Sequence, residues 1–397
     1  MKITIHRGTH QIGGVVVEIS TDANRIFIDI GDDLPGTDAA PFEEIDGLTC
    51  GNPTGSALFL THYHRDHIGR LPSVMPDVPI YMGETAKKIL LNLAHLVDKE
   101  NLPLYEKITT FKPADKIMVG GIAVMPLMVD HSAFDAYMFV VTADGKRVLH
   151  TGDFRTHGFR GGKTAKMLSA YAKDIDYIIS EGTMLGRAGE RVISERELQT
   201  KATKLLQENK YSFVLCSSTN IDRIAAFYHA ARKARRIFLC DKYQRDQLEA
   251  VRAAHAEKSS LYDFKNIYDV KRIDTVSDKL ISLIEDKGFC MLLRKNDNHK
   301  PYLKRYGENA VIIYSMWSGY LSGKTADSKL IDFLAPYHVI PLHTSGHATA
   351  EALKEIYNTV KPKAGLIPFH SFNPEAFEAI IEKDKIILLA DGEVFNA

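Results

Sequence analysis

Three histidines and one aspartate lie within the six residues from His62 to His67. The apolar residues 57–60 before them predict a buried strand, so these side chains are expected on the turn at a strand's end. His62 and His64 are two residues apart, and extended backbone would direct both toward the same metal ion. Four donors are more than one tetrahedral ion usually takes from so short a loop, which leaves Asp66 and the last histidine for a second ion. The cluster therefore predicts a centre with two metal ions.

Other chelating side chains follow apolar runs far away in the sequence. His131 comes just after a run that ends at Val129, and it would supply the third imidazole of the first ion. Asp153 ends another run, and its two carboxylate oxygens would bridge both ions, which a neutral imidazole cannot do. His370 follows the run 365–369 and would complete the second ion. The expected ligands are His62, His64 and His131 for one ion, Asp66, His67 and His370 for the other, and Asp153 between them.

The elements that position these residues form two different patterns along the chain. Strands dominate the first part, where Asp29 closes the strand predicted for residues 25–30 and is placed to orient a ligand histidine from outside the coordination sphere. From about residue 187, strands and helices alternate, as in a parallel sheet with crossover helices. The sequence predicts an α/β protein in which residues 187–340 form a domain inserted between residues 1–186 and 341–397 of another domain.

Composition gives little further information about function. Lys plus Arg and Asp plus Glu both total 50, so the formal net charge is zero and bulk charge signals neither nucleic acid nor membrane. Three of the four cysteines lie in apolar runs, which favours reduced thiols over disulfides or zinc ligands. The chain begins with an alternating strand and no run approaches a membrane span, so we expect a cytoplasmic protein without membrane contact.

Two basic groupings lie in the predicted insert. Taken alone, such groupings are more often solvated surface than binding patches. Interleaved aromatic residues leave open a stacking surface for single-stranded nucleic acid. The groupings are Arg232, Lys233, Arg235 and Arg236, and then Arg294, Lys295, Lys300, Lys304 and Arg305; the aromatic residues are Tyr302, Tyr306 and Trp317.

The polar segments together resemble the motifs of a known family. Asp29, the segment 62–67, His131 and residues 151–153 resemble, in order and context, the four signature motifs of the metallo-β-lactamase superfamily. Three further motifs are similar to those of its β-CASP nuclease branch, in particular ribonuclease J and other RNA-processing members. They are Glu181 in Ser-Glu-Gly-Thr, His347 in Ser-Gly-His-Ala and His370 in Ile-Pro-Phe-His. Seven motifs in this order are specific, and they span nearly the whole chain.

The resemblance implies an αββα sandwich that carries the metal site, with a β-CASP α/β cap domain inserted into it and substrate entering between the two. His64 stands where a glutamate accompanies di-iron oxygen chemistry in this superfamily, which favours hydrolysis at two zinc ions, with manganese as the alternative. His370 is similar to the RNA-type members, because DNA-type members tend to carry valine there. The implied partner is an RNA substrate.

The expected reaction is metal-assisted hydrolysis of a phosphodiester. Two ions would lower the pKa of a bound water from about 15.7 toward about 7. Asp66, His347 and Glu181 are the expected catalytic residues: Asp66 holds an ion, and His347, oriented by Glu181, protonates the leaving oxygen or binds the phosphate. The turn of Ser345, Gly346 and His347 precedes a predicted helix, so its backbone N–H groups would bind phosphate.

Some features depart from ribonuclease J, and two other functions stay open. The last histidine is followed by Ser371-Phe372-Asn373-Pro374 instead of Gly-Glu. Residues 314–320 lack the expected Ile-Pro-Gly-Asn motif, and we expect no C-terminal domain of the ribonuclease J kind after Glu393. A small-molecule hydrolase would not need a cap of roughly 150 residues. A non-catalytic RNA-binding subunit would not need all seven motifs. Endonuclease against 5′ exonuclease action, and assembly into a homo-oligomer, are not readable from the residues.

Overall fold

The computed structural model describes residues 1–37, 40–185, 187, 191–270 and 276–397. The chain divides into two compact units, Met1–Glu190 with Gly346–Ala397, and Arg191–Ser345. The sequence placed the start of the insert between residues 186 and 187, and Gly186 lies outside the described residues. The second unit continues past residue 340 because β17 (His338–Pro341) pairs in parallel with β16 (Ala310–Tyr314) of that unit.

Two sheets form the first unit. The strand order of the seven-stranded sheet is β19 (Val394–Asn396), β1 (Lys2–Arg7), β2 (Val16–Ser20), β3 (Arg25–Ile28), β4 (Ser56–Phe59), β5 (Ile80–Gly83) and β6 (Thr109–Phe111). The order of the six-stranded sheet is β18 (Gly365–Phe369), β11 (Tyr177–Glu181), β10 (Lys146–His150), β9 (Ala136–Ala143), β8 (Ile122–Val129) and β7 (Ile117–Val119). Segments from both ends of the chain therefore contribute strands to both sheets.

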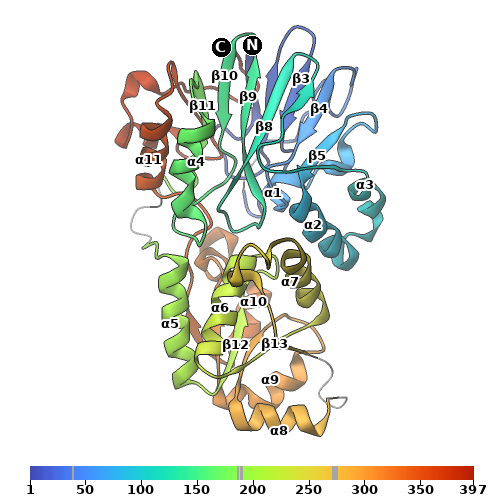
Figure 1. Ribbon diagram of the computed structural model, residues 1–397, viewed down its shortest axis with the longest axis vertical. Helices are drawn as coiled ribbons and strands as arrows, with labels where there is room; N and C mark the ends of the chain where they lie inside the picture. The colour runs from blue at the N-terminus through green and yellow to red at the C-terminus, as the bar shows by residue number, and fades with distance from the viewer. Residues whose placement is uncertain (38–39, 186, 188–190, 271–275) are drawn as a thin grey trace. The chain divides into compact units, whose positions relative to one another are not determined.

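Apolar side chains fill the space between these sheets and beneath the helices outside them. Phe59 of β4 and Phe139 of β9 meet edge to face, with ring centroids 5.8 Å apart, in a cluster that draws on both sheets. On the outer face of the six-stranded sheet, Leu168 of α4 (Thr164–Tyr171) and Ile356 of α11 (Ala350–Val360) pack with Met138 of β9. Figure 1 shows α2 (Glu84–Val97) and α3 (Leu102–Glu106) on the other side, beyond β5. This arrangement is the αββα sandwich, and the predicted fold class is confirmed.

Parallel pairing brings the polar strand ends to one edge of each sheet. β3 pairs in parallel with β4, and β10, β11 and β18 pair in parallel with one another. β9 and β10 form a hairpin at Asp144-Gly145, and both of these residues have the positive φ that a type I′ turn requires. The residues that follow β3, β4, β8, β10, β11 and β18 are those that the sequence marked as candidate ligands and their partners.

The second unit is a parallel α/β domain. The strand order is β14 (Ile267–Asp269), β13 (Ile237–Cys240), β15 (Phe289–Leu292), β12 (Tyr211–Leu215), β16 and β17, and each neighbouring pair is parallel. Its helices include α5 (Glu195–Glu208), α6 (Ile221–Lys233), α7 (Lys242–His255), α8 (Asp278–Lys287), α9 (Lys300–Tyr306) and α10 (Ser328–Leu334) (Figure 1). Strand and helix alternate here as the sequence predicted for the inserted domain.

A buried ion pair lies in the core of the second unit. The Arg223 guanidinium donates to Glu195 at 2.8 Å, and both side chains are fully buried. The same guanidinium donates to the Ser315 hydroxyl at 2.7 Å and to the Thr344 carbonyl at 2.9 Å. Ser194 caps α5 as its sequence pattern predicted, by accepting the Glu197 N–H at 3.1 Å. Arg223 thus fixes the strand end at Ser315 and the segment that leaves this unit toward Gly346.

Two expectations from composition can be compared with the structure. The four cysteines are free thiols, and the three in apolar runs, Cys216, Cys240 and Cys290, are buried as predicted. Burial raises the pKa of Cys216 and of Cys240 to about 12, which makes these thiols unreactive. Among the residues that the structure describes, no helix is long and apolar enough to span a membrane.

Candidate metal centre and active site

The histidine-rich segment leaves β4 and forms the single helical turn α1 (Arg65–Ile68). The tight course of this turn depends on Gly31, because a Cβ atom built there would lie 1.6 Å from the carbonyl oxygen of Asp66. Backbone hydrogen bonds join the turn to the end of β3, with Ile30 N–H donating to the His67 carbonyl at 2.8 Å. The loop is therefore held between two strand ends, where its side chains face the edge of the sheet.

The candidate ligands converge as two adjacent groups. Nitrogen atoms of His62, His64 and His131 lie within 4.8 Å of one another, and so do the ligand atoms of Asp66, His67 and His370. These are the two sets that the sequence assigned to two ions. His131 Nε2 lies 3.2 Å from His64 Nδ1, and a cation shared by the two lone pairs would remove their mutual repulsion.

Asp153 lies between the two groups. Its Oδ2 is 3.2 Å from His67 Nε2, 3.9 Å from His131 Nε2 and 4.0 Å from His62 Nε2. Its Oδ1 is 3.4 Å from His370 Nδ1. Gly152, which has a φ of 52°, makes the turn that carries Asp153 away from β10. A carboxylate placed in this way can contribute one oxygen to each of two cations.

The chemistry of these donors fits a pair of divalent cations. Five of their polar atoms are buried and have no hydrogen-bond partner in the protein: His62 Nε2, His67 Nε2, His370 Nε2 and both carboxylate oxygens of Asp153. Leaving a buried polar group unsatisfied costs about 1–3 kcal/mol each, and more for a charged group, so a folded chain normally provides such atoms with a partner. Imidazole nitrogens and carboxylate oxygens directed at a common space are the ligands that zinc and related divalent metals take.

Asp29 fixes the orientation of two ligand rings. Its Oδ2 accepts the His67 Nδ1–H at 2.7 Å and the Thr61 hydroxyl at 2.7 Å, and its Oδ1 accepts the Thr61 N–H at 2.7 Å. Because the Thr61 hydroxyl proton is used in this way, its oxygen accepts from His62 Nδ1 at 3.0 Å. Both rings therefore carry a proton on Nδ1, and Nε2 is the nitrogen of each ring that is directed at the metal position. Asp29 itself has a φ of 61°, a left-handed conformation that aspartate tolerates better than most residues.

Two more ligand rings are oriented from other parts of the chain. His131 Nδ1–H donates to the Gly346 carbonyl at 2.7 Å, since a carbonyl can only accept, and this leaves Nε2 free. Gly346 is required for this approach, because a Cβ atom there would lie 2.6 Å from the Ser132 hydroxyl oxygen. The Thr183 hydroxyl lies 2.8 Å from His370 Nδ1. His370 also has a left-handed φ of 49°, so two of the site residues hold strained backbone.

Burial and charge prepare most of these rings to bind a cation. Burial lowers the pKa of His62 and His131 well below the usual value, and neighbouring imidazoles lower it further. Burial also lowers the pKa of His64 to about 4. His67 differs: burial lowers its pKa, but Asp153, Asp29 and Asp66 together raise it well above the usual value. Most ligand rings are therefore neutral at pH 7, whereas His67 must lose a proton before it can bind a metal.

Glu181 and His347 form a pair beside Asp153. His347 Nδ1 is 3.1 Å from Glu181 Oε2 and 3.6 Å from Asp153 Oδ2. Glu181 is fully buried, and its carboxylate also accepts the N–H groups of Phe154 and Ala348 at 3.1 and 3.3 Å. Ligand atoms of Glu181, His347, Asp153 and His370 also lie within 4.8 Å of one another. Since the Glu181 oxygens are already occupied as acceptors, we assign Glu181 to positioning His347 rather than to holding an ion.

The remaining predicted residues lie at the junction between the units. Ser345 is buried and is the last residue of the second unit, whereas Gly346 and His347 begin the final part of the first. Helix α11 starts at Ala350, after the N-cap Thr349, whose hydroxyl accepts the Ala352 N–H at 3.3 Å. The carbonyl of Gly346 is directed at His131, so Gly346 has an orienting role that the sequence did not reveal.

Sequence reasoning missed residues that hold the ligands. Thr61 and Thr183 orient His62 and His370, and Asp130 binds Arg155 at 2.9 Å in a buried pair beside His131. Of these residues, Thr61 is the one that the sequence could have indicated, because it directly precedes the histidine segment. His150 is a further buried imidazole near the site, where burial lowers its pKa to about 3, but it stacks near Phe369 and is in neither ligand group.

One interpretation of the second basic grouping was wrong. Tyr302 and Tyr306 are buried in the core of the second unit, so they offer no stacking surface. They are four residues apart on α9, which places both on its inner face. Three of the nearby cations are paired with acids: Arg294 with Asp241 at 2.7 Å, Lys300 with Asp297 at 2.8 Å and Arg305 with Glu285 at 2.5 Å.

Two stacked sheets with chelating residues at one edge are typical of a known class of proteins. Comparison with known families identifies that class. Residues 24–193 match the Beta-lactamase superfamily domain, and the chain contains a domain of the metallo-β-lactamase superfamily. A crystal structure of a protein of unknown function from Enterococcus faecalis V583 has the same fold, with a TM-score of 0.76, 23% identity and coverage of 99% of both chains.

Within this class the chain resembles ribonuclease J, as its motifs predicted. It is 26% identical to ribonuclease J of Mycoplasma pneumoniae over 430 residues, which cover 99% of this chain and 73% of that protein. It is 26% identical to ribonuclease J of Thermus thermophilus over 359 residues, which cover 85% of this chain and 61% of that protein. A third relative, the DNA cross-link repair protein pso2/snm1 of Schizosaccharomyces pombe, is 35% identical over 121 residues, 30% of this chain and 19% of that protein.

Proposed function

We propose that this protein is a ribonuclease that hydrolyses RNA phosphodiester bonds with two divalent metal ions. The observation that carries the proposal is the pair of adjacent ligand groups joined by Asp153, in which five buried polar atoms have no hydrogen-bond partner among the described residues. The resemblance to ribonuclease J over 99% of the chain supports RNA as the substrate. Both ligand groups and the Glu181–His347 pair are complete, which supports an enzyme rather than a binding subunit.

The proposed ligand residues form two sets, one for each ion. His62, His64 and His131 would hold one ion, and Asp66, His67 and His370 the other, with Asp153 shared. Two bound divalent ions supply Lewis-acid stabilisation of phosphate charge and a lower pKa for water at the site. Burial raises the pKa of the Asp66 carboxyl, but His67 and His370 lower it by more, so the carboxylate stays ionised and available to a cation. Zinc suits the imidazole-rich group, and manganese would be accepted by the mixed oxygen and nitrogen group.

His347 is the candidate proton donor. Burial lowers its pKa, but Glu181 and Asp153 raise it by more, so the net shift is upward and favours the protonated ring. Its Nδ1–H donates to Glu181, and Nε2 is therefore the atom that would hold the proton for the leaving oxygen. The Ser345-Gly346-His347 turn would bind the scissile phosphate through its backbone N–H groups.

The substrate class is tested with end-labelled oligomers. We expect metal-loaded protein to cleave RNA. Comparing RNA with DNA oligomers would show the sugar preference of the enzyme, and comparing 5′-phosphate, 5′-hydroxyl and 5′-triphosphate ends would show which 5′ end it requires. Product lengths would also distinguish endonuclease from 5′ exonuclease action. Failure to cleave any of these, together with hydrolysis of a thioester or lactone, would refute the nuclease assignment in favour of a small-molecule hydrolase.

The role of His347 is tested by substitution. His347→Ala should retain both ions and lower turnover by about 10² to 10⁴, the range expected for loss of a general acid. His95→Ala is the matched control, because His95 is exposed on α2 and outside both ligand groups. Metal content is measured by elemental analysis and turnover with RNA at saturating concentration. Unchanged turnover in His347→Ala would remove this residue from the mechanism.

A further inference from the structure

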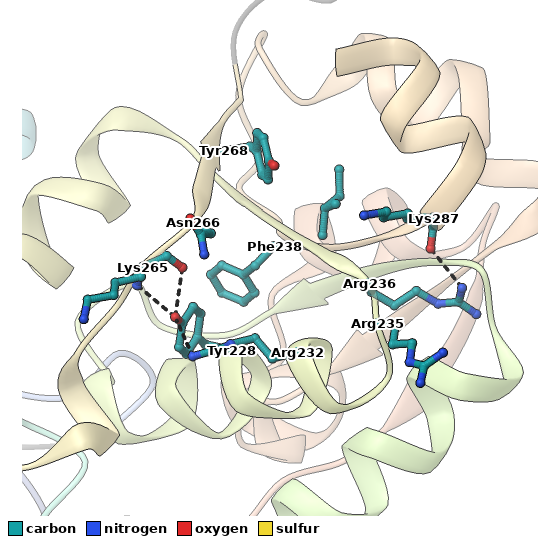
Figure 2. Close-up of a pocket in the computed structure, with 10 residues that line it drawn as sticks. Tyr228, Arg232, Arg235, Arg236, Phe238, Lys265, Asn266, Tyr268 and Lys287 are labelled. Carbon is teal, nitrogen blue, oxygen red and sulfur yellow. Dashed lines mark hydrogen bonds between the residues drawn. The ribbon is translucent and has the colours of Figure 1, made fainter. Parts of the chain in front are cut away.

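A cavity of about 590 Å³ opens in the second unit, where β13 and β14 begin and α6 ends. Figure 2 shows Phe238 in the middle of its lining, between Tyr228 and Tyr268. Phe238 packs edge to face on Tyr228, with ring centroids 5.5 Å apart, and both are buried, whereas Tyr268 is partly exposed. The volume lies in the range of sites that hold organic ligands, about 300–1,000 Å³. The cavity therefore has an aromatic base, in which Tyr268 is the partly exposed ring.

The lining is strongly cationic and contains no acidic residue. The five cations are Arg232, Arg235, Arg236, Lys265 and Lys287. Lys265 is neutralised by Asp263 at 2.5 Å, and Arg236 donates to the carbonyls of Leu206 and Lys287 at 2.8 and 2.9 Å. The other three form no ion pair with any acid in the described part of the chain. They are also exposed, so their charge is available to a ligand in solution.

The helix dipole accounts for only part of this set of charges. A cation in the last turn of a helix is favoured by the partial negative charge there, and this holds for Arg232 on α6 and for Lys287, the last residue of α8. Arg235 lies beyond the end of α6, and the dipole does not explain why the two helix ends meet at one cavity. Residues from separate segments have converged on one cavity, which distinguishes it from the second basic grouping, where three of the cations have acidic partners.

Arg235 occupies a position that glycine normally fills. Its φ is 57°, and α6 ends in a Schellman motif: Arg235 N–H donates to the Arg232 carbonyl at 3.1 Å, and Arg236 N–H to the Ala231 carbonyl at 2.9 Å. A side chain strains the left-handed conformation that this motif requires, whereas glycine adopts it freely. Glycine would end this helix without strain, so arginine here places a cationic side chain at the rim of the cavity at a conformational cost.

We propose that this cavity is a second RNA site, formed wholly by residues of the second unit, in which single-stranded RNA binds. Arg232, Arg235 and Lys287 would contact backbone phosphates, and the partly exposed ring of Tyr268 would stack on a base. The choice of RNA rests on the proposed function, and the aromatic ring beside the cations favours a nucleic acid over an acidic peptide. Such a site would add affinity for RNA to that supplied by the residues of the metal centre.

The test measures RNA binding without cleavage. All proteins carry His347→Ala, are loaded with zinc, and are titrated by fluorescence anisotropy with a labelled single-stranded RNA over a range of salt concentrations. Arg232→Gln, Arg235→Gly and Lys287→Gln are made singly and together. The triple variant should weaken binding about tenfold at low salt and reduce the salt slope by about 2, since each phosphate contact on a single strand contributes about 0.7. Arg235→Gly separates binding from folding, because it should weaken binding while the melting temperature stays equal or rises.

Matched controls and competing ligands decide the outcome. Arg305→Gln removes one positive charge from the same unit, but this residue is paired with Glu285, and RNA affinity should not change. Unchanged affinity and salt slope in the triple variant would overturn the proposal. It would also be overturned if ADP, or a peptide of glutamates, bound more tightly than RNA and lost that binding in the triple variant. Because binding is measured without turnover, these results are independent of whether the parent protein cleaves RNA.

Discussion

Asp29→Asn tests whether one buried carboxylate controls the metal centre. The substitution keeps the shape of the side chain, and asparagine tolerates the left-handed backbone at this position. Three donors converge on the carboxylate: Thr61 N–H on Oδ1, and the Thr61 hydroxyl and His67 Nδ1–H on Oδ2. An amide has one acceptor oxygen, and at the Oδ2 position this oxygen accepts from two of the three donors. Its NH₂ group then faces the Thr61 N–H, and that buried donor loses its partner.

The expected magnitudes follow from these contacts. One unsatisfied buried N–H lowers the free energy of unfolding of the metal-free protein by about 1–3 kcal/mol. The neutral amide also holds the rings of His67 and His62 less firmly, and loss of such an orienting group typically weakens metal affinity about 10–100-fold. That range corresponds to about 1.4–2.8 kcal/mol of binding free energy.

Affinity is measured by competition with a chromophoric chelator, and stability by urea unfolding of the metal-free chain. Asp22→Asn is the matched control, because this aspartate has a side chain that is 98% exposed and pairs only with Lys2. The control should change the free energy of unfolding by less than about 0.5 kcal/mol. If Asp29→Asn binds zinc as tightly as the parent, the inferred chain of orientation from Asp29 through Thr61 to the ligands is wrong.

Three further predictions concern the pH dependence of the site, its loop and the second unit. Since the pKa of His67 is raised well above its usual value, its ring is protonated at pH 7 without metal, and zinc uptake should release about one proton per chain. Calorimetry in buffers of different ionisation enthalpy measures this proton release. A binding enthalpy that does not depend on the buffer would contradict the prediction. Gly31→Ala should abolish zinc retention in elemental analysis, because the added Cβ would lie 1.6 Å from the Asp66 carbonyl, and retention of two ions would contradict this. Glu195→Gln should lower the free energy of unfolding of the second unit by about 3–5 kcal/mol, because it leaves the Arg223 charge buried without a counter-charge; a loss below about 1 kcal/mol in urea unfolding would show that the pair is dispensable.

The strand ends were predictable from the sequence because each combines a local apolar run with a polar residue just after it. Helix α2 has a signal of the same local kind, because its buried residues recur at helical spacing along one face. Helix α7 was not predicted, although Asp241 and Gln244 form a capping box at its start. That signal is a single pair of residues and is easily overlooked between two strands.

The hydrogen bonds that orient the ligands were not predictable because they join residues distant in the sequence. His131 and Gly346 are 215 positions apart, and Thr183 and His370 are 187 positions apart. No local pattern specifies such a contact; it follows from the order of strands in the sheet. The tyrosines of α9 show the opposite error, since a sequence that alternates basic and aromatic residues suggests a surface until the helical period places the tyrosines inside.

The order in which the chain is synthesised has a consequence for the metal centre. β18 pairs with β11, and the residue after β18 is His370, while the carbonyl that orients His131 belongs to Gly346. Both residues come after the second unit in the chain. A nascent polypeptide that has emerged only as far as Ser345 therefore has six of the seven candidate ligand residues but lacks His370 and the acceptor for His131. Translation of the final segment is the step that brings together all the residues of the candidate metal centre.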